Sequence, residues 1–212
     1  AGGEGFFASC DATDRSSIEE ARAEIASEFG VAGVLVNSAG GNQPQVTLTD
    51  ELRFEGIAND DWRNCFDLNL GAGAFLPCQV FGPALVARGR GSIINIASIA
   101  GMCGRDRRMY DRTGLGQQPI GYAAAKGGVI SMTLDLAGYL TPKGVRVNAV
   151  SPGGFERGQV QEFIDAYSDA TPMGRMGRDG VDLKGAILFL ASDASSLMTG
   201  QVLVVDGGYS IV

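Results

Sequence analysis

Short apolar runs alternate with segments of helical periodicity along almost the whole chain of 212 residues. Apolar runs of strand length occur at residues 5–10, 34–36, 92–97, 145–150 and 202–205. Apolar residues at helical spacing predict helices at 16–29, 59–88, 121–140, 160–167 and 179–191. Such alternation is typical of a parallel sheet with helices on both faces. We therefore predict one α/β domain over residues 1–212, a doubly wound parallel sheet in three αβα layers.

Two predicted helices carry signals at their ends. Ser16 and Glu19 form a capping box, and Gly30 is expected to end the helix that they begin. The buried face predicted for this helix comprises Ile18, Ala21, Ile25 and Phe29. Asn59 is expected to cap the long second helix, and bends are expected there at Gly71, Gly73, Pro77 and Pro83.

Composition narrows the class of protein. A hydrophobic share of 45% with 19% charged residues indicates a globular chain, and the net charge of −7 argues against nonspecific nucleic-acid binding. The longest apolar stretches, such as 185–191, are too short to span a bilayer, and residues 1–7 do not resemble a signal peptide. The four cysteines form no CxxC pair, which indicates reduced thiols in a cytoplasmic protein. With no histidine, the chain can form neither a Ser-His-Asp triad nor a His-ligated zinc site, and we predict no metal.

Tyr122, Lys126 and Ser98 are the strongest candidates for chemistry. Tyr122 and Lys126 lie four residues apart in a predicted helix, so their side chains share one face. A nearby ammonium favours ionisation of a phenol, whose pKa is ordinarily about 10, and a tyrosine so tuned can exchange protons near neutral pH. Ser98 ends an apolar run and could hold a substrate oxygen. This combination suits the interconversion of an alcohol and a carbonyl. The alternatives are an ordinary helix-surface pair and a strand-end turn residue.

Six segments, in the right order, resemble the short-chain dehydrogenase/reductase family. Asn37–Gly40 is similar to the family's NNAG segment, Asp67–Leu70 to the segment of its catalytic asparagine, and Ile94–Ser98 to the strand that ends in its catalytic serine. Tyr122 with Lys126 matches the YxxxK pair, Ser151–Gly153 the PG turn beside the nicotinamide, and Thr199–Gly208 the last strand with its flanks.

The resemblance implies a Rossmann-like fold, an NAD or NADP cofactor and a set of site residues. The implied catalytic residues are Asn69, Ser98, Tyr122 and Lys126. In the family pattern Asn69 positions a water that relays protons to Lys126, which also binds the nicotinamide ribose. The implied cofactor-binding residues are Asp11, Asn37, Ala39, Gly40, Tyr122, Lys126, Pro152 and Gly153. Asp11 could equally be a turn residue, and Asn37 and Gly40 could simply shape a strand end. Family members assemble as homodimers or homotetramers, which we expect here too.

The sequence departs from the family pattern in three ways. The pattern begins with a strand, a TGxxxGxG turn that holds the cofactor pyrophosphate, and a second strand, whereas this chain starts at what resembles the third strand. We therefore expect an N-terminally truncated fold and a fragment of a longer protein, and the choice between NAD and NADP stays open. Ser98 and Tyr122 lie 24 positions apart (122 − 98), with an arginine-rich loop between them. Arg157 replaces a threonine that contacts the nicotinamide amide in many members.

The arginine-rich loop is the clue to the substrate. It holds Arg105, Arg107, Arg108 and Arg112, and guanidinium groups recognise carboxylates and phosphates. We expect an anionic or polyhydroxylated substrate such as a sugar acid or polyol, with a higher KM for acids after loss of Arg107 and Arg108. Residues 39–44 and 75–82 resemble stretches of mannonate-type dehydrogenases. A solvated or subunit-contact loop is the alternative. The rival functions are a 3-oxoacyl carrier-protein reductase and a noncatalytic binding or assembly protein.

Overall fold

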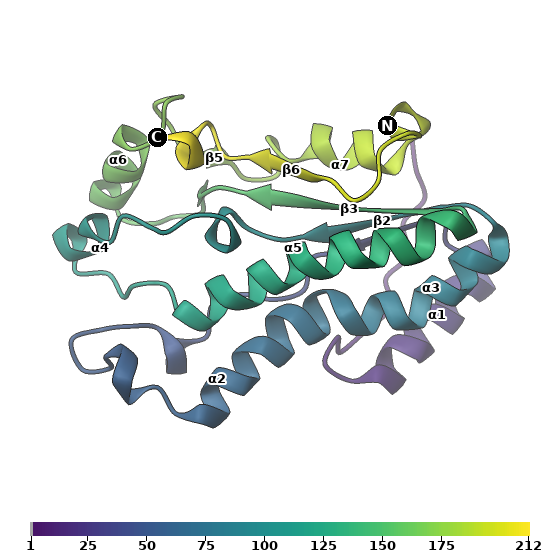
Figure 1. Cartoon of the computed structure of the whole chain (residues 1–212), viewed down its shortest axis with the longest axis horizontal. Helices are drawn as coiled ribbons and strands as arrows, with labels where there is room; N and C mark the ends of the chain where they lie inside the picture. Colours follow the sequence, from purple (N-terminus) through teal and green to yellow (C-terminus); the bar gives the residue numbers. More distant parts are fainter. Residues whose placement is uncertain (1) are drawn as a thin grey trace.

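The computed structural model describes residues 2–212 and contains a parallel sheet of four strands, which confirms the predicted α/β class (Figure 1). The sheet order is β1-β2-β3-β6, and Ile93 of β2 is in register with Val147 of β3. The strands are β1 (Val34–Asn37), β2 (Gly91–Ile96), β3 (Val145–Pro152) and β6 (Val202–Val205). Four of the five predicted strands therefore form, with shifts of at most two residues at their ends.

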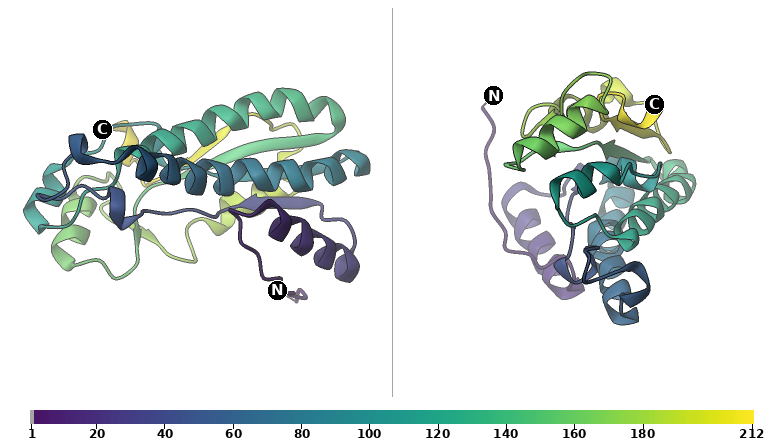
Figure 2. Two further views of the ribbon diagram at one scale, coloured as in Figure 1. Left: turned by 90° about the horizontal axis from the view of Figure 1, so that it is seen from below. Right: turned by 90° about the vertical axis from the view of Figure 1, so that its left-hand side faces the viewer.

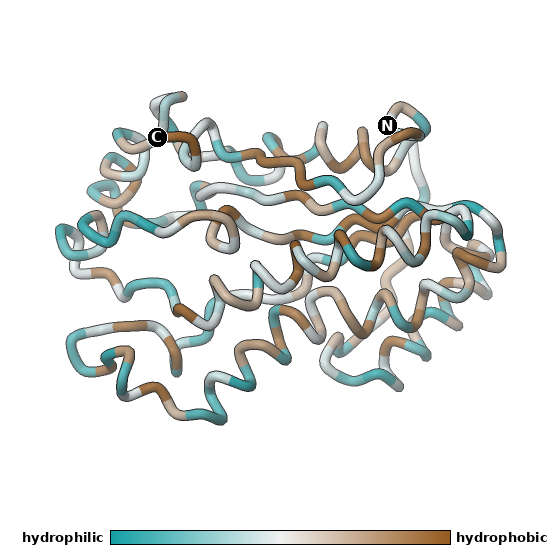
Figure 3. The backbone as a smooth tube through the Cα atoms, viewed as in Figure 1, coloured by the Kyte–Doolittle hydropathy of each residue, from teal (hydrophilic) through white to brown (hydrophobic). Residues whose placement is uncertain are grey.

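Helices cover both faces of the sheet because successive strand residues point to opposite sides. On one face, Ile93 packs with Leu85 of α3 (Leu76–Arg88) and Leu140 of α5 (Ile120–Leu140). On the other face, Ile94 packs with Leu190 of α7 (Lys184–Ala191). All five of these aliphatic side chains are at most 6% exposed. Apolar stretches of the backbone lie along the strands of the sheet, the edge strand β6 included (Figure 3). The three-layer prediction is confirmed.

The predicted long helix runs from 59 to 88 in three consecutive parts: α2 (Asn59–Phe66), the π-helical segment η3 (Asp67–Phe75) and α3. It lies alongside α5 (Figure 2). The wider turns of η3 include Gly71 and Gly73, and a Cβ at Gly73 would lie 2.9 Å from the carbonyl oxygen of Ala39. The helix can therefore approach the end of β1 closely.

This helix also corrects the expectation that no stretch could span a bilayer. Residues Asn59–Arg88 form one helix that is long and apolar enough to do so by length and composition, and 39% of its most apolar window is buried. The core helix of a globular protein passes the same test. Here the helix packs on α5 and the sheet, with Cys78 and Leu85 in the core.

The predicted strand at 5–10 is wrong. These residues form no strand, and Phe6 and Phe7 are 46% and 87% exposed. A strand needs a hydrogen-bonded neighbour, and β1 pairs only with β2 among residues 2–212. Phe6 instead meets the ring of Phe29 edge-on, with 6.3 Å between centroids.

The first helix, α1 (Arg15–Phe29), begins one residue earlier than predicted. Asp14 is its N-cap, and the Asp14 carboxylate accepts from the Ser16 backbone N–H at 3.0 Å. Glu19 pairs with Arg15 at 2.8 Å instead of completing a capping box. Ile18 and Ala21 are buried as predicted, but Phe29 is half exposed. Gly30 ends the helix, as expected.

The remaining elements surround the carboxyl ends of the strands. The arginine-rich loop contains a short helix, α4 (Arg108–Thr113), which packs against α6 (Gln161–Asp169). A two-stranded parallel ladder joins β4 (Phe155–Glu156) to β5 (Gly177–Arg178). Residues 179–183, predicted as helix, form turns before α7. Asn59 lies inside α2, whose N-cap is Ala58.

Candidate active site

A cleft of about 810 Å³ opens beyond the carboxyl ends of β2 and β3. This edge is where open parallel sheets bind ligands, and the volume is typical of small-molecule sites. Three predicted catalytic residues, Ser98, Tyr122 and Lys126, line it together. So do the predicted cofactor-binding residues Gly40, Pro152 and Gly153.

Ser98 follows β2 and is held by the turn that it begins. It is the N-cap of a 3₁₀ turn at Ile99–Gly101, and its Oγ accepts from the Ala100 backbone N–H at 3.1 Å. A Cβ at Gly101 would lie 2.5 Å from the backbone N of Gly127 in α5. Only glycine lets this turn contact α5 so closely, and that contact brings Ser98 beside Tyr122.

Tyr122 lies in the first turn of α5 and faces Ser98 across the cleft. Burial raises the pKa of the Tyr122 phenol, while the nearby Ser98 hydroxyl and the positive charges of Arg105 and Arg157 oppose that rise. The phenol is therefore protonated at neutral pH. The expected lowering of its pKa by Lys126 is not seen; the cations that act on it are the two arginines.

Lys126 lies one turn further along α5 and is 4% exposed. Its Nζ donates to the carbonyl oxygen of Ile96 at 2.7 Å and lies 5.7 Å from the centroid of the Tyr122 ring. Burial lowers the pKa of Lys126 to about 8. The bond to the end of β2 fixes the ammonium at the base of the cleft, where it can meet a ligand.

Asn69 lies in the π-helical segment and is fully buried. Its Oδ1 accepts from the Gly41 backbone N–H at 2.8 Å, and its Nδ2 donates to the carbonyl oxygens of Gly41 and Cys65 at 3.1 and 3.0 Å. The amide thus holds the loop after β1 and does not itself line the cleft. A Cβ at Gly40 would lie 2.8 Å from this Oδ1, which explains the glycine there.

Asn37 and Ala39 support the cleft from behind. The Asn37 amide donates to Asn95 Oδ1 at 2.8 Å, and Asn95 donates in turn to Thr133 Oγ1 of α5 at 2.9 Å. This buried chain of hydrogen bonds ties β1, β2 and α5 together. Neither Asn37 nor Ala39 lines the cleft.

The backbone around the cleft leaves room for a flat, extended group. Gly40 and Gly41 carry no side chain on one wall, and Pro152 and Gly153 form the other. A Cβ at Gly153 would lie 2.8 Å from Asp206 Cβ, so a larger residue would disturb this wall. Bare backbone next to Lys126 fits the nicotinamide end of a dinucleotide, which supports the cofactor prediction.

Asp11 is not brought to the cleft. Its carboxylate accepts from the Thr13 backbone N–H at 2.9 Å and from the Thr13 hydroxyl at 2.7 Å. Those bonds lower the pKa of this exposed carboxyl. In this structure Asp11 closes a turn before α1, as in the alternative reading of the sequence.

Of the four arginines in the arginine-rich loop, one lines the cleft, Arg105. Arg108 is paired with Asp106 at 2.7 Å on the exposed surface, and Arg107 donates to Gln117. Arg157 also lines the cleft and pairs with Asp179 at 2.9 Å. Arg107 and Arg108, which were expected to meet the substrate, do not line the cleft, whereas Arg105 does.

An aromatic wall was missed by the sequence reasoning. It consists of Tyr110 of α4, Phe163 and Tyr167 of α6, and Tyr209 near the C-terminus. Tyr167 stacks on Tyr209 with 4.7 Å between centroids, and its hydroxyl accepts from the Gly154 backbone N–H at 2.6 Å. Helical spacing of Phe163 and Tyr167 was the available signal, but it also fits plain core packing.

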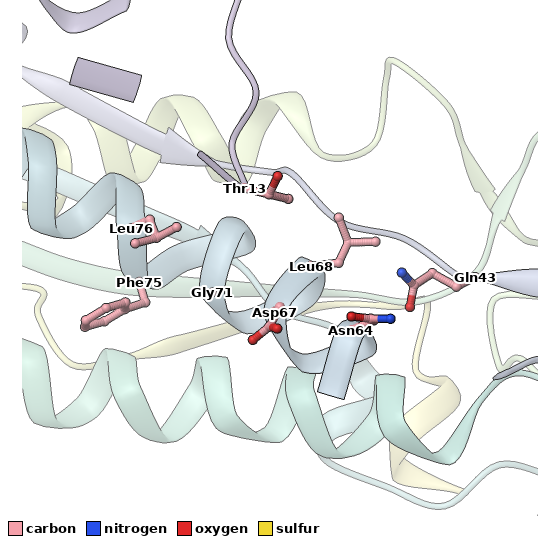
Figure 4. Close-up of a pocket in the computed structure, with 8 residues that line it drawn as sticks. All are labelled: Thr13, Gln43, Asn64, Asp67, Leu68, Gly71, Phe75 and Leu76. Carbon is pink, nitrogen blue, oxygen red and sulfur yellow. The ribbon is translucent and has the colours of Figure 1, made fainter. Parts of the chain in front are cut away.

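A second, more open groove lies between the turn before α1 and the long helix (Figure 4). Thr13 and Gln43 contact it from loops, and Asp67, Gly71 and Phe75 from η3. It contains none of the predicted catalytic residues. Among residues 2–212 no cluster of potential metal ligands occurs, and all four cysteines are free thiols.

Comparison with known proteins identifies the class. A family model described as enoyl-(acyl carrier protein) reductase matches residues 1–210. The chain is 34% identical to a 3-oxoacyl-(acyl-carrier-protein) reductase of Thermotoga maritima and covers 74% of it with 94% of its own length. It is 36% identical to galactitol 2-dehydrogenase of Cereibacter sphaeroides, covering 74% of that protein with 95% of its own length.

Solved structures of dehydrogenases are also similar to this chain. A short-chain dehydrogenase from Leptospira borgpetersenii with bound NAD⁺ is 35% identical, with a TM-score of 0.82 over 95% of this chain and 74% of that one. A gluconate 5-dehydrogenase from Burkholderia cenocepacia, in complex with NADP and tartrate, is 30% identical, with a TM-score of 0.80 over the same shares. The fold and site define an NAD(P)-dependent oxidoreductase that interconverts an alcohol and a carbonyl. The chain belongs to the short-chain dehydrogenase/reductase family.

Proposed function

We propose that this protein uses NAD(P) to interconvert an alcohol and a carbonyl on a sugar acid or polyol, with Tyr122 as the proton-transfer group. One observation carries this proposal: the Ser98 hydroxyl, the Tyr122 phenol and the buried Lys126 line one cleft, with Lys126 Nζ 5.7 Å from the centroid of the Tyr122 ring. The similarity to galactitol 2-dehydrogenase supports the polyol class.

The Tyr122 and Ser98 hydroxyls have different roles at the substrate oxygen. When bound, the nicotinamide supplies or accepts the hydride. In reduction Tyr122 donates its proton to the carbonyl oxygen, while Ser98 donates a hydrogen bond that stabilises the negative charge developing there. In oxidation the Tyr122 oxygen takes the hydroxyl proton. Because the Tyr122 pKa is raised, its proton-donating form predominates at neutral pH.

Lys126 and Asn69 act around this pair. We assign Lys126 to the nicotinamide ribose and to the proton path behind Tyr122, a role suited to an ammonium with a pKa of about 8. Asn69 is a positioning residue, because its amide fixes the Gly41 backbone that forms one wall of the cleft. Gly40, Pro152 and Gly153 are proposed to contact the cofactor, with Asn37 and Ala39 behind them. For Asp11 we propose a contact with the adenine of the cofactor, although Asp11 lies in the turn before α1 and does not line the cleft.

The rival activity is 3-oxoacyl-(acyl-carrier-protein) reduction, favoured by the relative from Thermotoga maritima. Both activities would use the same four residues, Asn69, Ser98, Tyr122 and Lys126. Only the substrate that is turned over distinguishes the two activities. The test is a panel of polyols, sugar acids and a 3-oxoacyl thioester, with nicotinamide absorbance as the readout. We expect turnover of polyols or sugar acids. Exclusive turnover of the thioester would replace the proposal by its rival, and no nicotinamide-linked turnover of any of them would refute it.

We also propose a cytoplasmic homodimer or homotetramer. Free thiols at all four cysteines suit a reducing compartment. Around the edge strand β6 and helix α7, the apolar residues Leu188, Leu197 and Ile211 are 69%, 100% and 82% exposed. Apolar surface of this kind favours association.

A further inference from the structure

Arg105 is one of the two arginines that line the cleft, the other being Arg157. Six arginines form ion pairs with carboxylates: Arg15, Arg63, Arg108, Arg157, Arg175 and Arg178. Arg105 forms none with any carboxylate among residues 2–212, although it is partly buried. Its guanidinium lies 5.8 Å from the centroid of the Tyr122 ring, at the reacting end of the cleft.

The cleft as a whole has a positive lining. Its charged residues are Arg105, Lys126 and Arg157, and neither an aspartate nor a glutamate among residues 2–212 lines it. This occurs in a chain with a net charge of −7. Arg157 is neutralised by Asp179 at 2.9 Å, and Lys126 is committed to the Ile96 carbonyl. Lys126 also lacks a carboxylate partner but is assigned to the nicotinamide ribose, so Arg105 is the cleft cation that remains without an ion pair for the substrate.

From this arrangement we infer that Arg105 binds a carboxylate of the substrate, so that the enzyme prefers sugar acids to the corresponding neutral polyols. The inference deepens the proposed function and rests on it. A planar guanidinium can hold a carboxylate through two parallel hydrogen bonds, and its partly buried setting strengthens such a pair. The Tyr110 side chain lines the same cleft as Arg105.

The test compares D-gluconate with D-glucitol, which differ at one end as carboxylate and hydroxymethyl group. KM and kcat are measured for both in the full-length enzyme and in its Arg105→Gln and Arg105→Lys variants. Arg108→Gln is the matched control, because Arg108 lies in the same loop but is exposed and paired with Asp106. Calorimetric titration of gluconate gives a readout independent of turnover.

We expect gluconate to have the lower KM in the wild type. Arg105→Gln should raise that KM by roughly 10–100-fold, the loss typical of a charge-assisted hydrogen bond. The KM of glucitol and the affinity for the cofactor should change far less, Arg105→Lys should restore part of the loss, and Arg108→Gln should show none.

Two results would overturn the inference. The first is an equal effect of Arg105→Gln on the KM of both substrates, which would indicate a purely electrostatic effect on Tyr122. The second is that gluconate does not bind to the wild type, or binds equally well to the Arg105→Gln variant. Failure of the proposed function looks different. In that case neither compound is turned over, while gluconate still binds in an Arg105-dependent way.

Discussion

Among single residues, Lys126 leads to a prediction about how the free energy of unfolding depends on pH. Its side chain is buried without a carboxylate, and its pKa falls to about 8 from 10.5. Between these two values the unfolded chain binds a proton that the folded chain has released. The free energy of unfolding therefore rises with pH across this window, and below it the protein carries a constant penalty for burying the charge.

Replacing Lys126 by Met should therefore stabilise the fold while it removes activity. We expect the free energy of unfolding at pH 7 to rise by roughly 1–3 kcal/mol. Loss of the hydrogen bond to the Ile96 carbonyl reduces this gain. The difference from wild type should shrink between pH 8 and pH 10.5. Urea denaturation at several pH values measures it. A destabilised K126M protein at pH 7 would show that the bond to Ile96 outweighs the burial of the charge.

The raised pKa of Tyr122 leads to a prediction about direction. Oxidation needs the phenolate, which becomes more populated as pH rises toward the pKa, whereas reduction uses the phenol that predominates at neutral pH. The value of kcat/KM for oxidation should increase steadily from pH 6 to pH 9, while that for reduction stays level or falls. Rate profiles in both directions check this. An oxidation rate that peaks below pH 7 would assign proton transfer to another group.

Residue types and spacing were enough to find Ser98, Tyr122 and Lys126, because local helix geometry fixes Tyr122 and Lys126 on one face. They were not enough to separate Arg105 from Arg107 and Arg108. The side-chain directions in that loop depend on α4 and on the bridge between Leu48 and Gln117, which joins residues far apart in the chain. Orientation of this kind is not encoded locally.

At the level of elements, the contact between the Ser98 turn and α5 positions the site. Gly101 lies against the α5 backbone at Gly127, so Gly101→Ala must push the two apart. We expect kcat to fall at least tenfold, since small misplacements of catalytic groups are costly. Gly104→Ala is the control, because a Cβ there would meet nothing within 4 Å. Steady-state kinetics of both variants test this, and equal activities would mean that the turn tolerates the displacement.

Asn69 gives a second prediction at this scale. Asn69→Ala leaves the Gly41 N–H without its buried acceptor, which should cost about 2 kcal/mol of stability and raise the KM for the cofactor. The exposed Asn64, one turn earlier on the same long helix, serves as control. Denaturation and cofactor titration measure both effects. An unchanged cofactor KM would limit Asn69 to a role in stability.

Elements were predicted well where their signals are local. The helical periodicity of 121–140 and the apolar run of 92–97 each gave an element within one residue of its observed bounds. The run at 5–10 failed because strand formation depends on a neighbour, which the run itself does not specify. The capping box at Ser16 failed because Asp14, two residues earlier, offers a carboxylate for the same backbone donors.

For the whole molecule, assembly is the property that the exposed apolar surface predicts. Changing Leu188 and Leu197 together to Lys should shift a dimer or tetramer toward smaller species, since charges are costly at a buried apolar contact. Size-exclusion chromatography with light scattering measures the mass. Phe54→Lys, which changes another exposed apolar residue at 58% exposure, is the control. An unaltered mass in the double variant would place the interface elsewhere.

The central claim is that Tyr122 transfers the substrate proton, and the most direct test is the Tyr122→Phe variant. It keeps the ring and its packing and removes only the hydroxyl. The account predicts a fall in kcat of roughly 10²–10⁴-fold for the substrate that the panel identifies. A variant that keeps most of its turnover would contradict the account and transfer the proton-transfer role to another group in the cleft.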